Sequence, residues 1–289
     1  MATQGVEFAN VSFTLGDREG AGGRRILSDV SLSVEAGTTT ALLGRSGSGK
    51  TTLLRMVNAL VLPTAGSVRV GGQDAKGVDP TVLRRGIGYV IQETGLFPHM
   101  SIERNVGMAL ELGGQSRAAI ARRAAEMLEL VGLGEGFATR NPWQLSGGQR
   151  QRAGLARALA GEPGVLLMDE PFGALDPLTR AEMQTMLREL LRRLGKTTLI
   201  VTHDLEEALY LADRVVLLEE GRVVADLAAG EVRESEIEAV RKYVAATHRV
   251  PESRSVTPGF SRDDKQIPSG NDSEKSKNNS ESNHGSFGR

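Results

Sequence analysis

Residues 44–51 read GRSGSGKT and fit the pattern G-x-x-x-x-G-K-[ST]. The apolar run Ala41–Leu43 precedes this stretch and a helical pattern, Thr52–Leu60, follows it, which is the strand–loop–helix order of a phosphate-binding loop. Glycines let backbone N–H groups turn toward phosphate oxygens, and the start of the helix adds partial positive charge. The predicted nucleotide-binding residues here are Gly44, Arg45, Ser46, Gly47, Ser48, Gly49, Lys50, Thr51 and Thr52.

Two side chains of this loop have specific chemical roles in a site of that kind. The ammonium group of Lys50 is expected to reach the β- and γ-phosphates, and the hydroxyl of Thr51 to ligate Mg²⁺. The loop therefore predicts a nucleoside triphosphate and Mg²⁺ as the bound groups.

Farther along the chain, the apolar stretch Val165–Asp169 reads as a strand that ends in two adjacent carboxylates, Asp169 and Glu170. Burying two acids side by side in a core without a cation would be costly, so the pair favours a metal site. Asp169, at the end of the strand, is expected to hold Mg²⁺ through its water shell. Glu170 is one position later and is expected to polarise an attacking water.

Two more polar residues follow predicted strands in the same manner. His203 comes after Thr197–Thr202, a strand that we expect beside the phosphate-loop strand, so its imidazole would lie at the same crevice and bond the γ-phosphate or the water. Gln92 comes after Ile87–Ile91, and its amide can bridge metal, water and a moving loop. The candidate catalytic residues are thus Glu170, His203 and Gln92, and the candidate metal ligands are Thr51, Gln92 and Asp169.

Short β-branched runs alternate with helical patterns over residues 1–250, which predicts an α/β fold with a largely parallel sheet covered by helices. Apolar residues recur at helical spacing between Met183 and Leu194, and again between Ile120 and Val131. The predicted strands are Val6–Phe13, Thr38–Leu43, Ile87–Ile91, Val165–Asp169, Thr197–Thr202 and Arg214–Leu218.

A second anion-binding sequence lies at Leu145–Gln149, which reads LSGGQ and precedes the helical pattern Arg150–Leu159. A serine and two glycines at the start of a helix offer free N–H groups and a favourable dipole to an anion. The chain thus holds two phosphate-binding helix starts, which is more than one triphosphate needs from a single subunit.

Together these motifs resemble those of the ATP-binding subunits of ATP-binding-cassette (ABC) transporters. The resemblance covers about residues 5–230 and rests on the order of the phosphate loop, Gln92, LSGGQ, the VLLMDE stretch at 165–170, Asp176 and His203. It implies a P-loop NTPase cassette with a mostly parallel core sheet, an N-terminal antiparallel β part and a helical subdomain over about residues 93–160.

The resemblance also implies how two such subunits share ATP. It implies a head-to-tail dimer, in which the signature LSGGQ of one subunit covers ATP on the phosphate loop of the other, and the loop Gly173–Asp176 crosses the interface. The residues expected to contact the partner's ATP are Ser146, Gly147, Gly148, Gln149 and Asp176.

The family usually stacks the adenine ring on an aromatic residue of the first strand, and this chain departs from that pattern. By the register of the motif the position is occupied by Leu15, and Phe13 lies two residues earlier on the same strand face. Phe13 is our first candidate for the adenine contact, with Leu15 as the alternative. Residues 17–25 read as an extended hairpin insert nearby.

The residues after Glu170 resemble those of importers that use an extracytoplasmic substrate-binding protein. GYVIQ at 88–92 and GLFPH at 95–99 look most like the ATPases of glycine betaine, choline and carnitine (osmoprotectant) uptake. The resemblance implies transmembrane permease subunits, a second ATP-binding subunit that forms a homodimer, indirect action of the binding protein and a peripheral location at the cytoplasmic face of the membrane. The apolar pair Leu96 and Phe97 in the loop after Gln92 is a candidate partner contact.

Two alternatives stay open: an importer ATPase for another small solute, and a soluble ABC ATPase that acts on nucleic acid or ribosomes. The net charge of −1 gives no basic field for nucleic acid, and residues 52–145 show no sustained heptads of an inserted coiled coil. We therefore predict no nucleic-acid partner.

Composition sets the remaining expectations. The chain contains no cysteine, which excludes disulfides and thiolate metal sites. No apolar run approaches the roughly 18 residues of a membrane span, and the first residues do not read as a secretory signal. Residues 251–289 are rich in Ser, Asn, Gly, Pro and charge, so we predict a folded domain over 1–250 and a disordered polar tail over 251–289.

Overall fold

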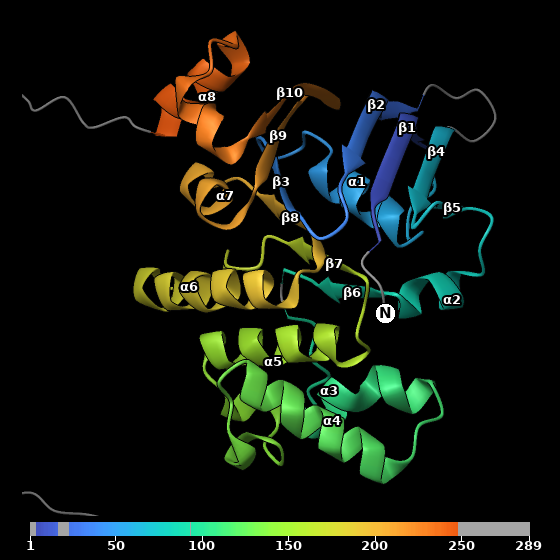
Figure 1. Cartoon of the computed structure of the whole chain (residues 1–289), viewed down its shortest axis with the longest axis vertical. Helices are drawn as coiled ribbons and strands as arrows, with labels where there is room; N and C mark the ends of the chain where they lie inside the picture. Colours follow the sequence, from blue (N-terminus) through green and yellow to red (C-terminus); the bar gives the residue numbers. More distant parts are fainter. Residues whose placement is uncertain (1–3, 17–22, 93, 248–289) are drawn as a thin grey trace, which may run out of the picture. The chain divides into compact units, whose positions relative to one another are not determined.

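The computed structural model describes residues 4–16, 23–92 and 94–247 of the chain. Its centre is a six-stranded sheet in the order β10-β9-β3-β8-β7-β6 (Figure 1). The five strands from β9 to β6 pair in parallel, and only β10 runs antiparallel, which confirms the predicted parallel sheet. The strands are β3 (Thr39–Leu43), β6 (Ile87–Val90), β7 (Val165–Asp169), β8 (Thr197–Thr202), β9 (Arg214–Glu219) and β10 (Arg222–Ala228).

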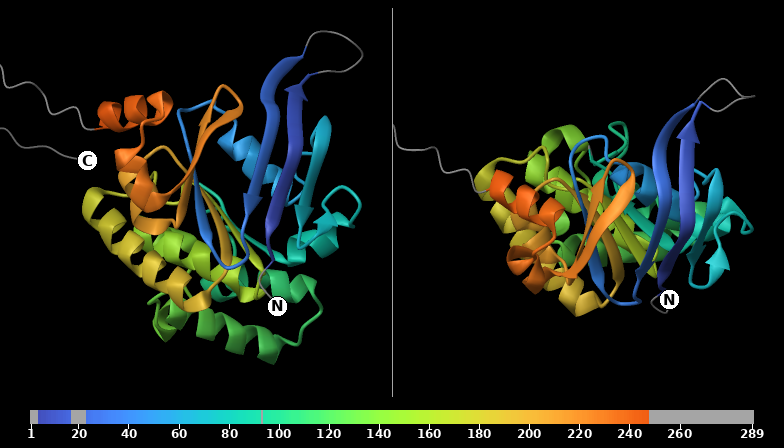
Figure 2. Two further views of the ribbon diagram at one scale, coloured as in Figure 1. Left: turned by 45° about the horizontal axis from the view of Figure 1, so that its top comes forward. Right: turned by 90° about the horizontal axis from the view of Figure 1, so that it is seen from above.

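The N-terminal part forms a second, antiparallel sheet in the order β2-β1-β4-β5, as the fold class predicted. Figure 2 shows it beside the central sheet, with α1 next to both. Its strands are β1 (Val6–Leu15), β2 (Arg24–Val34), β4 (Ala65–Val70) and β5 (Gln73–Asp74). Phe8 and Leu27 from this sheet pack with Leu42 of β3 and Leu54 of α1 in one buried cluster, so the two sheets share a core.

Helices cover the central sheet on both faces. The helix α1 (Lys50–Val57) follows the phosphate loop, α2 (Pro80–Arg85) precedes β6, and α6 (Pro177–Leu194) and α7 (Leu205–Leu211) follow β7 and β8. The short 3₁₀ helix η3 (Ala229–Glu234) and α8 (Glu238–Thr247) end the described part of the chain. Apolar residues of α7, η3 and α8 form a separate cluster with residues of β3, β9 and β10.

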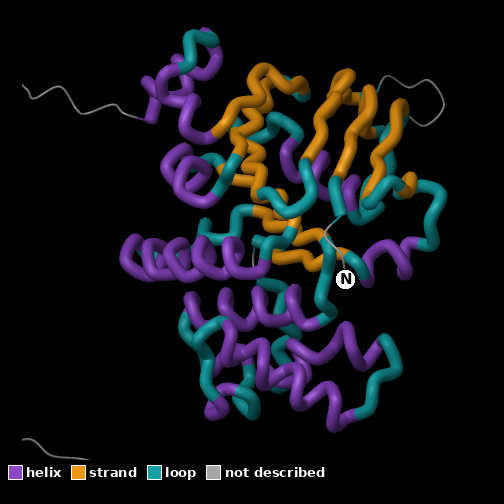
Figure 3. The backbone as a smooth tube through the Cα atoms, viewed as in Figure 1, coloured by secondary structure: helices purple, strands orange, loops and turns teal. Residues whose placement is uncertain are grey.

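Between β6 and β7 the chain is almost wholly helical, and Figure 3 shows this part as purple helices joined by loops. It contains α3 (Ile102–Leu112), α4 (Arg117–Leu130) and α5 (Gly147–Ala160), with the 3₁₀ turns η1 (Glu135–Phe137) and η2 (Pro142–Gln144). The three helices pack with α6 and one face of the central sheet around a second large cluster, which includes Val106, Leu128, Leu155 and Leu187.

The structure shows four strands that the sequence patterns missed, namely β2, β4, β5 and β10, and all four lie in antiparallel pairs. The hairpin predicted for residues 17–25 lies mostly outside the described residues, which omit 17–22; the strands on either side of it, β1 and β2, pair with Leu15 opposite Arg24. The tail predicted for residues 251–289 also lies outside the described residues. Within the described ranges, no helix has the length and apolar character that crossing a bilayer requires.

Candidate nucleotide-binding and hydrolysis site

The sheet brings the predicted site motifs to one edge. Leu43, the last residue of β3, pairs with Thr202 at the end of β8, and Asp169 of β7 pairs with Val201. The phosphate loop, His203 and Glu170 therefore all begin at the carboxyl ends of three adjacent parallel strands, where ligands bind in open α/β sheets. Gln92 follows the next strand, β6, two residues after its end at Val90.

Two glycines of the phosphate loop stand where a side chain would not fit. A Cβ at Gly44 would approach the carbonyl oxygen of Leu218 to 2.3 Å, and a Cβ at Gly49 would approach Leu27 Cδ2 to 2.6 Å. Both have positive φ, +154° and +101°, which disfavours other residues. The sequence pattern of the loop thus follows from the close packing of β9 and β2 against it.

Lys50 lies inside the loop and is only 5% exposed. Its Nζ donates hydrogen bonds to the carbonyl oxygens of Gly44 at 2.7 Å and Arg45 at 2.9 Å. Burial lowers the pKa of the Lys50 ammonium, while the charges of Glu170 and Asp169 act in the opposite direction. The loop therefore holds a cation at its centre, as a polyphosphate requires.

The polar groups of the loop fit an anionic ligand. Helix α1 begins after Gly49 without a side-chain cap, so the N–H groups of its first turn point into the loop. Within the described residues, the buried hydroxyl of Ser48 has no hydrogen-bond partner. Buried donors without partners are costly, and a phosphate group in the loop would satisfy them.

The three predicted metal ligands come from three elements, and the structure joins two of them directly. Thr51 donates from Oγ1 to Asp169 Oδ1 at 2.8 Å. Gln92 lines a cavity of about 440 Å³ together with Asp169. A hydroxyl, a carboxylate and an amide oxygen are the oxygen donors that Mg²⁺ prefers, so the residues present fit this metal.

Sequence reasoning did not identify two residues that contact the second carboxylate oxygen of Asp169. The hydroxyl of Tyr89 donates to Asp169 Oδ2 at 3.4 Å, and Arg55 Nη2 lies 3.9 Å from the same atom. Both line the cavity that contains Gln92. Burial raises the pKa of Tyr89, so its hydroxyl remains a donor at neutral pH. Tyr89 and Arg55 therefore lie on the Oδ2 side of the Asp169 carboxylate, and Oδ1 bonds to Thr51.

Glu170 and His203 face one another across the ends of β7 and β8. His203 Nδ1 lies 3.4 Å from Glu170 Oε2, with side chains 62% and 26% exposed, respectively. The backbone N–H of Glu170 donates to the carbonyl oxygen of Val201 at 2.9 Å. Glu170 has φ of +44°, which is uncommon for a residue with a side chain and is typical of functional positions.

The loop after His203 is connected to the loop before α6, which the sequence did not reveal. Asp204 caps α7 by accepting from the N–H groups of Glu206 and Glu207. Arg180, in α6, donates from Nη2 to the carbonyl oxygen of Leu175 at 3.3 Å, and its Nη1 lies 3.9 Å from Asp204 Oδ2. One side chain thus links the segment 173–176 to the segment that carries His203.

The signature residues form a capped helix start. Ser146 accepts a hydrogen bond from the N–H of Gln149, whose side chain accepts from the N–H of Ser146 in return. Asp176 caps α6 by accepting from the N–H of Thr179. No hydrogen bond or ion pair connects Ser146–Gln149 to the phosphate loop within the described chain, so these two predicted phosphate sites are separate in one subunit.

The two candidates for the adenine contact differ in their surroundings. Phe13 is partly buried and packs against the core cluster shared by the two sheets. Leu15 is 59% exposed. Phe13 therefore already has apolar partners, while the exposed side chain of Leu15 can still be covered by a ligand.

Glu207 is a buried carboxylate four residues after His203, on the first turn of α7, and it is 6% exposed. Burial and the neighbouring charge of Asp204 raise its pKa to about 7, and Glu170 acts in the same direction; a hydrogen bond with Thr202 and the charge of Arg180 oppose them. Its Oε1 has no hydrogen-bond partner among the described residues. The native state therefore binds a proton more tightly than the unfolded chain does.

This carboxylate predicts a pH dependence of stability. Because the pKa of Glu207 rises from 4.5 to about 7 on folding, its contribution to the free energy of unfolding is present below pH 4.5 and is lost as the pH rises toward 7. In denaturant melts, the free energy of unfolding of the wild-type chain should fall by up to about 3 kcal/mol between pH 4.5 and 7 relative to that of Glu207→Gln, at 1.36 kcal/mol per pKa unit. The exposed Glu129→Gln is the control; identical pH profiles for wild type and Glu207→Gln would contradict this assignment.

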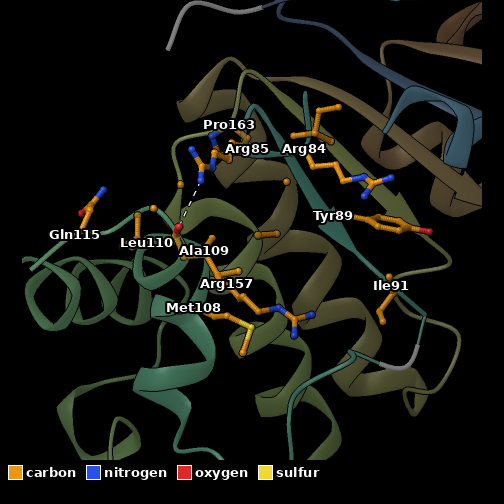
Figure 4. A pocket seen from close by; sticks show the side chains of 16 residues that line it. Arg84, Arg85, Tyr89, Ile91, Met108, Ala109, Leu110, Gln115, Arg157 and Pro163 are labelled. Carbon is orange, nitrogen blue, oxygen red and sulfur yellow. Dashed lines mark hydrogen bonds between the residues drawn. The ribbon is translucent and has the colours of Figure 1, made fainter. Parts of the chain in front are cut away.

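A groove opens between α3, the start of β6 and the end of α5, with a volume of about 560 Å³ (Figure 4). Three arginines line it, Arg84, Arg85 and Arg157, together with apolar residues that include Met108 and Leu112. Arg157 is largely buried, which lowers its pKa, and it donates to the carbonyl oxygens of Gly95 at 2.6 Å and Thr94 at 2.7 Å. The groove is thus tied to the loop that follows Gln92.

That loop presents only one of its two predicted apolar residues. Phe97 is 40% exposed, and its ring forms a T-shaped pair with that of His99. Leu96 instead packs against the core of the helical part, which corrects the expectation of an exposed pair. The buried side chain of Asn105 fixes the loop by bonding the main chain of Phe97 on both its N–H and its carbonyl group.

The comparisons with known proteins agree with this geometry. A family described as "ABC transporter" matches residues 27–173 of the chain. The dimeric structure of the ATP-binding cassette MJ0796, in a post-hydrolysis state bound to ADP and Pi, is 34% identical with a TM-score of 0.69, and the match covers 78% of this chain and 98% of that one.

Two relatives with similar sequences serve different transport systems. The glycine betaine/carnitine/choline transport ATP-binding protein OpuCA of Bacillus subtilis is 46% identical over 203 residues, which are 70% of this chain and 53% of OpuCA. The sulfate/thiosulfate import ATP-binding protein CysA 2 of Rhizobium meliloti is 53% identical over 201 residues, 68% of this chain and 54% of CysA 2. The chain spans about half the length of these relatives.

Proposed function

The chain belongs to the ABC transporter family, and on that premise we propose that it is a subunit that hydrolyses ATP to drive import through separate permease subunits. The observation that carries the proposal is the meeting of the phosphate loop, the Thr51–Asp169 pair and the Glu170–His203 pair at one edge of the sheet. Phosphoryl transfer to water requires stabilisation of charge and orientation of the nucleophile. The Thr51–Asp169 pair would serve the first requirement by holding Mg²⁺, and the Glu170–His203 pair would serve the second.

In the proposed mechanism each residue performs one task. The loop N–H groups and Lys50 bind the phosphates and offset their charge. Mg²⁺, when bound by Thr51, Asp169 and Gln92, would supply further stabilisation of the charge on the transferred group. Glu170 orients the attacking water and accepts its proton at the carboxylate. His203, 3.4 Å from Glu170, holds the geometry at the γ-phosphate.

We further propose that the working unit is a head-to-tail homodimer. The separation of Ser146–Gln149 from the phosphate loop in one subunit supports it, because the two sites can share one ATP only across an interface. The similar cassette MJ0796 is dimeric in a structure bound to ADP and Pi, which supports a dimer. In the dimer Ser146, Gly147, Gly148, Gln149 and Asp176 would approach the partner's ATP.

The helical part, predicted over about residues 93–160, is the proposed permease contact, and the arginine-lined groove and Phe97 are its candidate surface. The groove shares Tyr89 and Ile91 with the cavity at Asp169, so a partner seated there would lie next to Gln92. This location at the permease would place the chain peripherally at the cytoplasmic face of the membrane.

Phe97→Asp should strongly weaken permease binding and leave the basal ATP turnover of the isolated chain within about twofold. An aromatic residue at the centre of an interface is typically worth 2 kcal/mol or more, so affinity should fall by at least about 30-fold. Binding is measured by co-purification from detergent-solubilised membranes. Ile237→Asp is the matched control, because Ile237 is 39% exposed and lies outside the helical part. Retained transport by Phe97→Asp would place the docking surface elsewhere.

For the transported solute we propose quaternary-amine osmoprotectants such as glycine betaine, choline or carnitine. The motifs GYVIQ and GLFPH and the relatedness to OpuCA support it. The higher identity to CysA 2 favours a second candidate, an oxyanion such as sulfate. Calorimetric titration of the binding protein that co-purifies with the chain, first with glycine betaine and then with sulfate, distinguishes the two.

The proposal as a whole is tested by measuring which partner increases the rate of ATP hydrolysis. Phosphate release should increase when the chain is assembled with its permease and the solute-loaded binding protein in vesicles. Stimulation by DNA or RNA without the permease would instead favour a soluble ABC ATPase.

A further inference from the structure

The last helix of the described chain contacts the loop that carries His203. The hydroxyl of Tyr243, in α8, donates a hydrogen bond of 2.8 Å to the main-chain carbonyl oxygen of His203. The two residues are 40 positions apart, and no motif in the sequence connects them.

Packing fixes the position of Tyr243 itself. Val240, one turn earlier on α8, is 3% exposed, and Tyr243 and Val244 pack with it against the cluster that contains Leu43 and Leu205. Leu43 is the last residue before the phosphate loop, and Leu205 is two residues after His203. Helix α8 therefore packs against the strand end before the phosphate loop and against the segment after His203.

Burial keeps this hydroxyl a donor. It raises the pKa of Tyr243 to about 12, with a further contribution from Asp204 and an opposing one from Arg45 of the phosphate loop. The side chain thus stays protonated at neutral pH and lies within electrostatic range of both loops.

The contact matters because little else holds His203. Its side chain is 62% exposed, so few neighbours pack on the imidazole, and the position of Nδ1 relative to Glu170 Oε2 depends on the backbone of the loop. The other anchors of this segment all act on Asp204: its N–H is bonded to Thr202 Oγ1 at 3.0 Å, its carboxylate caps α7, and Arg180 Nη1 lies 3.9 Å from its Oδ2. Among the described residues, only Tyr243 donates a hydrogen bond to the carbonyl oxygen of His203.

We propose that Tyr243 is a positioning residue for ATP hydrolysis, acting through the carbonyl group of His203 to hold the imidazole at Glu170. The proposal rests on the function proposed above. It extends the site beyond the family's motifs to α8, and it makes this helix a structural part of the hydrolysis machinery.

The test is the variant Tyr243→Phe, which keeps the ring and removes the hydroxyl. We expect kcat for ATP to fall about three- to tenfold, the range typical of one lost hydrogen bond, with KM for ATP unchanged. Tyr210→Phe is the matched control, because the Tyr210 hydroxyl lies 3.4 Å from Thr185 Oγ1 of α6, and in the described part of the chain no hydrogen bond joins it to His203. It should match wild type.

The double variant separates positioning from general damage. If Tyr243 acts through His203, Tyr243→Phe should cause no further loss of turnover in a His203→Ala background. A loss of equal size in both backgrounds, or unchanged kcat in the single variant, would overturn the proposal.

Amide hydrogen exchange gives a readout that does not depend on turnover. Exchange in a peptide covering residues 202–208 should become faster in Tyr243→Phe than in wild type, and exchange around the phosphate loop should not change. If the wild-type chain does not hydrolyse ATP, the proposed function fails, and exchange alone then decides whether Tyr243 holds the His203 loop. Identical exchange in the two proteins would overturn the inference.

Discussion

The Glu170→Gln variant is expected to hydrolyse ATP about 10²–10⁴-fold more slowly than the wild-type chain, the typical contribution of a general base. Glutamine keeps the shape and hydrogen bonding of the side chain and removes its charge. ATP affinity should stay nearly unchanged, because in the proposed site the loop and Lys50, not Glu170, would bind the phosphates. Phosphate release and equilibrium binding of ATP measure the two effects separately.

The environment of each neighbouring group explains why Glu170 is expected to accept the proton. Asp169 is engaged by Thr51 on one oxygen and by Tyr89 on the other. His203 lies 3.4 Å from Glu170 and can hold geometry without taking the proton. Lys50→Ala provides the contrast, because it should lose nucleotide binding as well as turnover. Turnover of Glu170→Gln within about threefold of wild type would make His203 the next candidate for the base.

The Ser146→Arg variant is expected to bind ATP and yet lose both dimerisation and turnover. In the proposed dimer, a long charged side chain at this position would enter the space of the partner's γ-phosphate. Nucleotide binding should persist, because Ser146 has no contact with the phosphate loop of its own subunit among the described hydrogen bonds. Turnover near the wild-type rate would contradict the composite site.

This substitution also removes the cap of α5, at a typical cost of about 1 kcal/mol. The matched control is therefore Ser116→Arg, since Ser116 caps α4 through the same kind of bond, to the N–H of Ala119 at 3.3 Å. Both variants lose one helix cap, and only Ser146→Arg should lose turnover. Equal loss in the two would mean that destabilisation, not the interface, is responsible.

The meeting of the candidate site residues could be predicted from the sequence because they follow strands that are adjacent and parallel. An apolar run that ends in a polar residue places that residue at the ligand-binding edge, which holds for Asp169 and His203. Residues that act from a helix face could not be found this way. Arg55 and Tyr243 reach Asp169 and His203 through long side chains, and Arg180 reaches Asp204, the residue after His203. Nothing in their local sequence indicates the direction in which these side chains point.

The antiparallel strands were harder to predict than the parallel ones. Buried parallel strands such as β7 and β8 are continuous apolar runs. The strand β2, in contrast, alternates buried and exposed residues and contains polar ones throughout its length. The helix α6 begins at Pro177, six residues before the first apolar residue of the recognised pattern, because Asp176 caps it and proline is favoured in the first turn.

The central claim is that two copies of this chain close on ATP to form the hydrolysis site. Sedimentation velocity of Glu170→Gln tests it most directly, because this variant should bind ATP without consuming it. The account predicts a monomer without nucleotide or with ADP, and a dimer with ATP and Mg²⁺. A monomer under all three conditions, with ATP binding confirmed in the same sample, would contradict it.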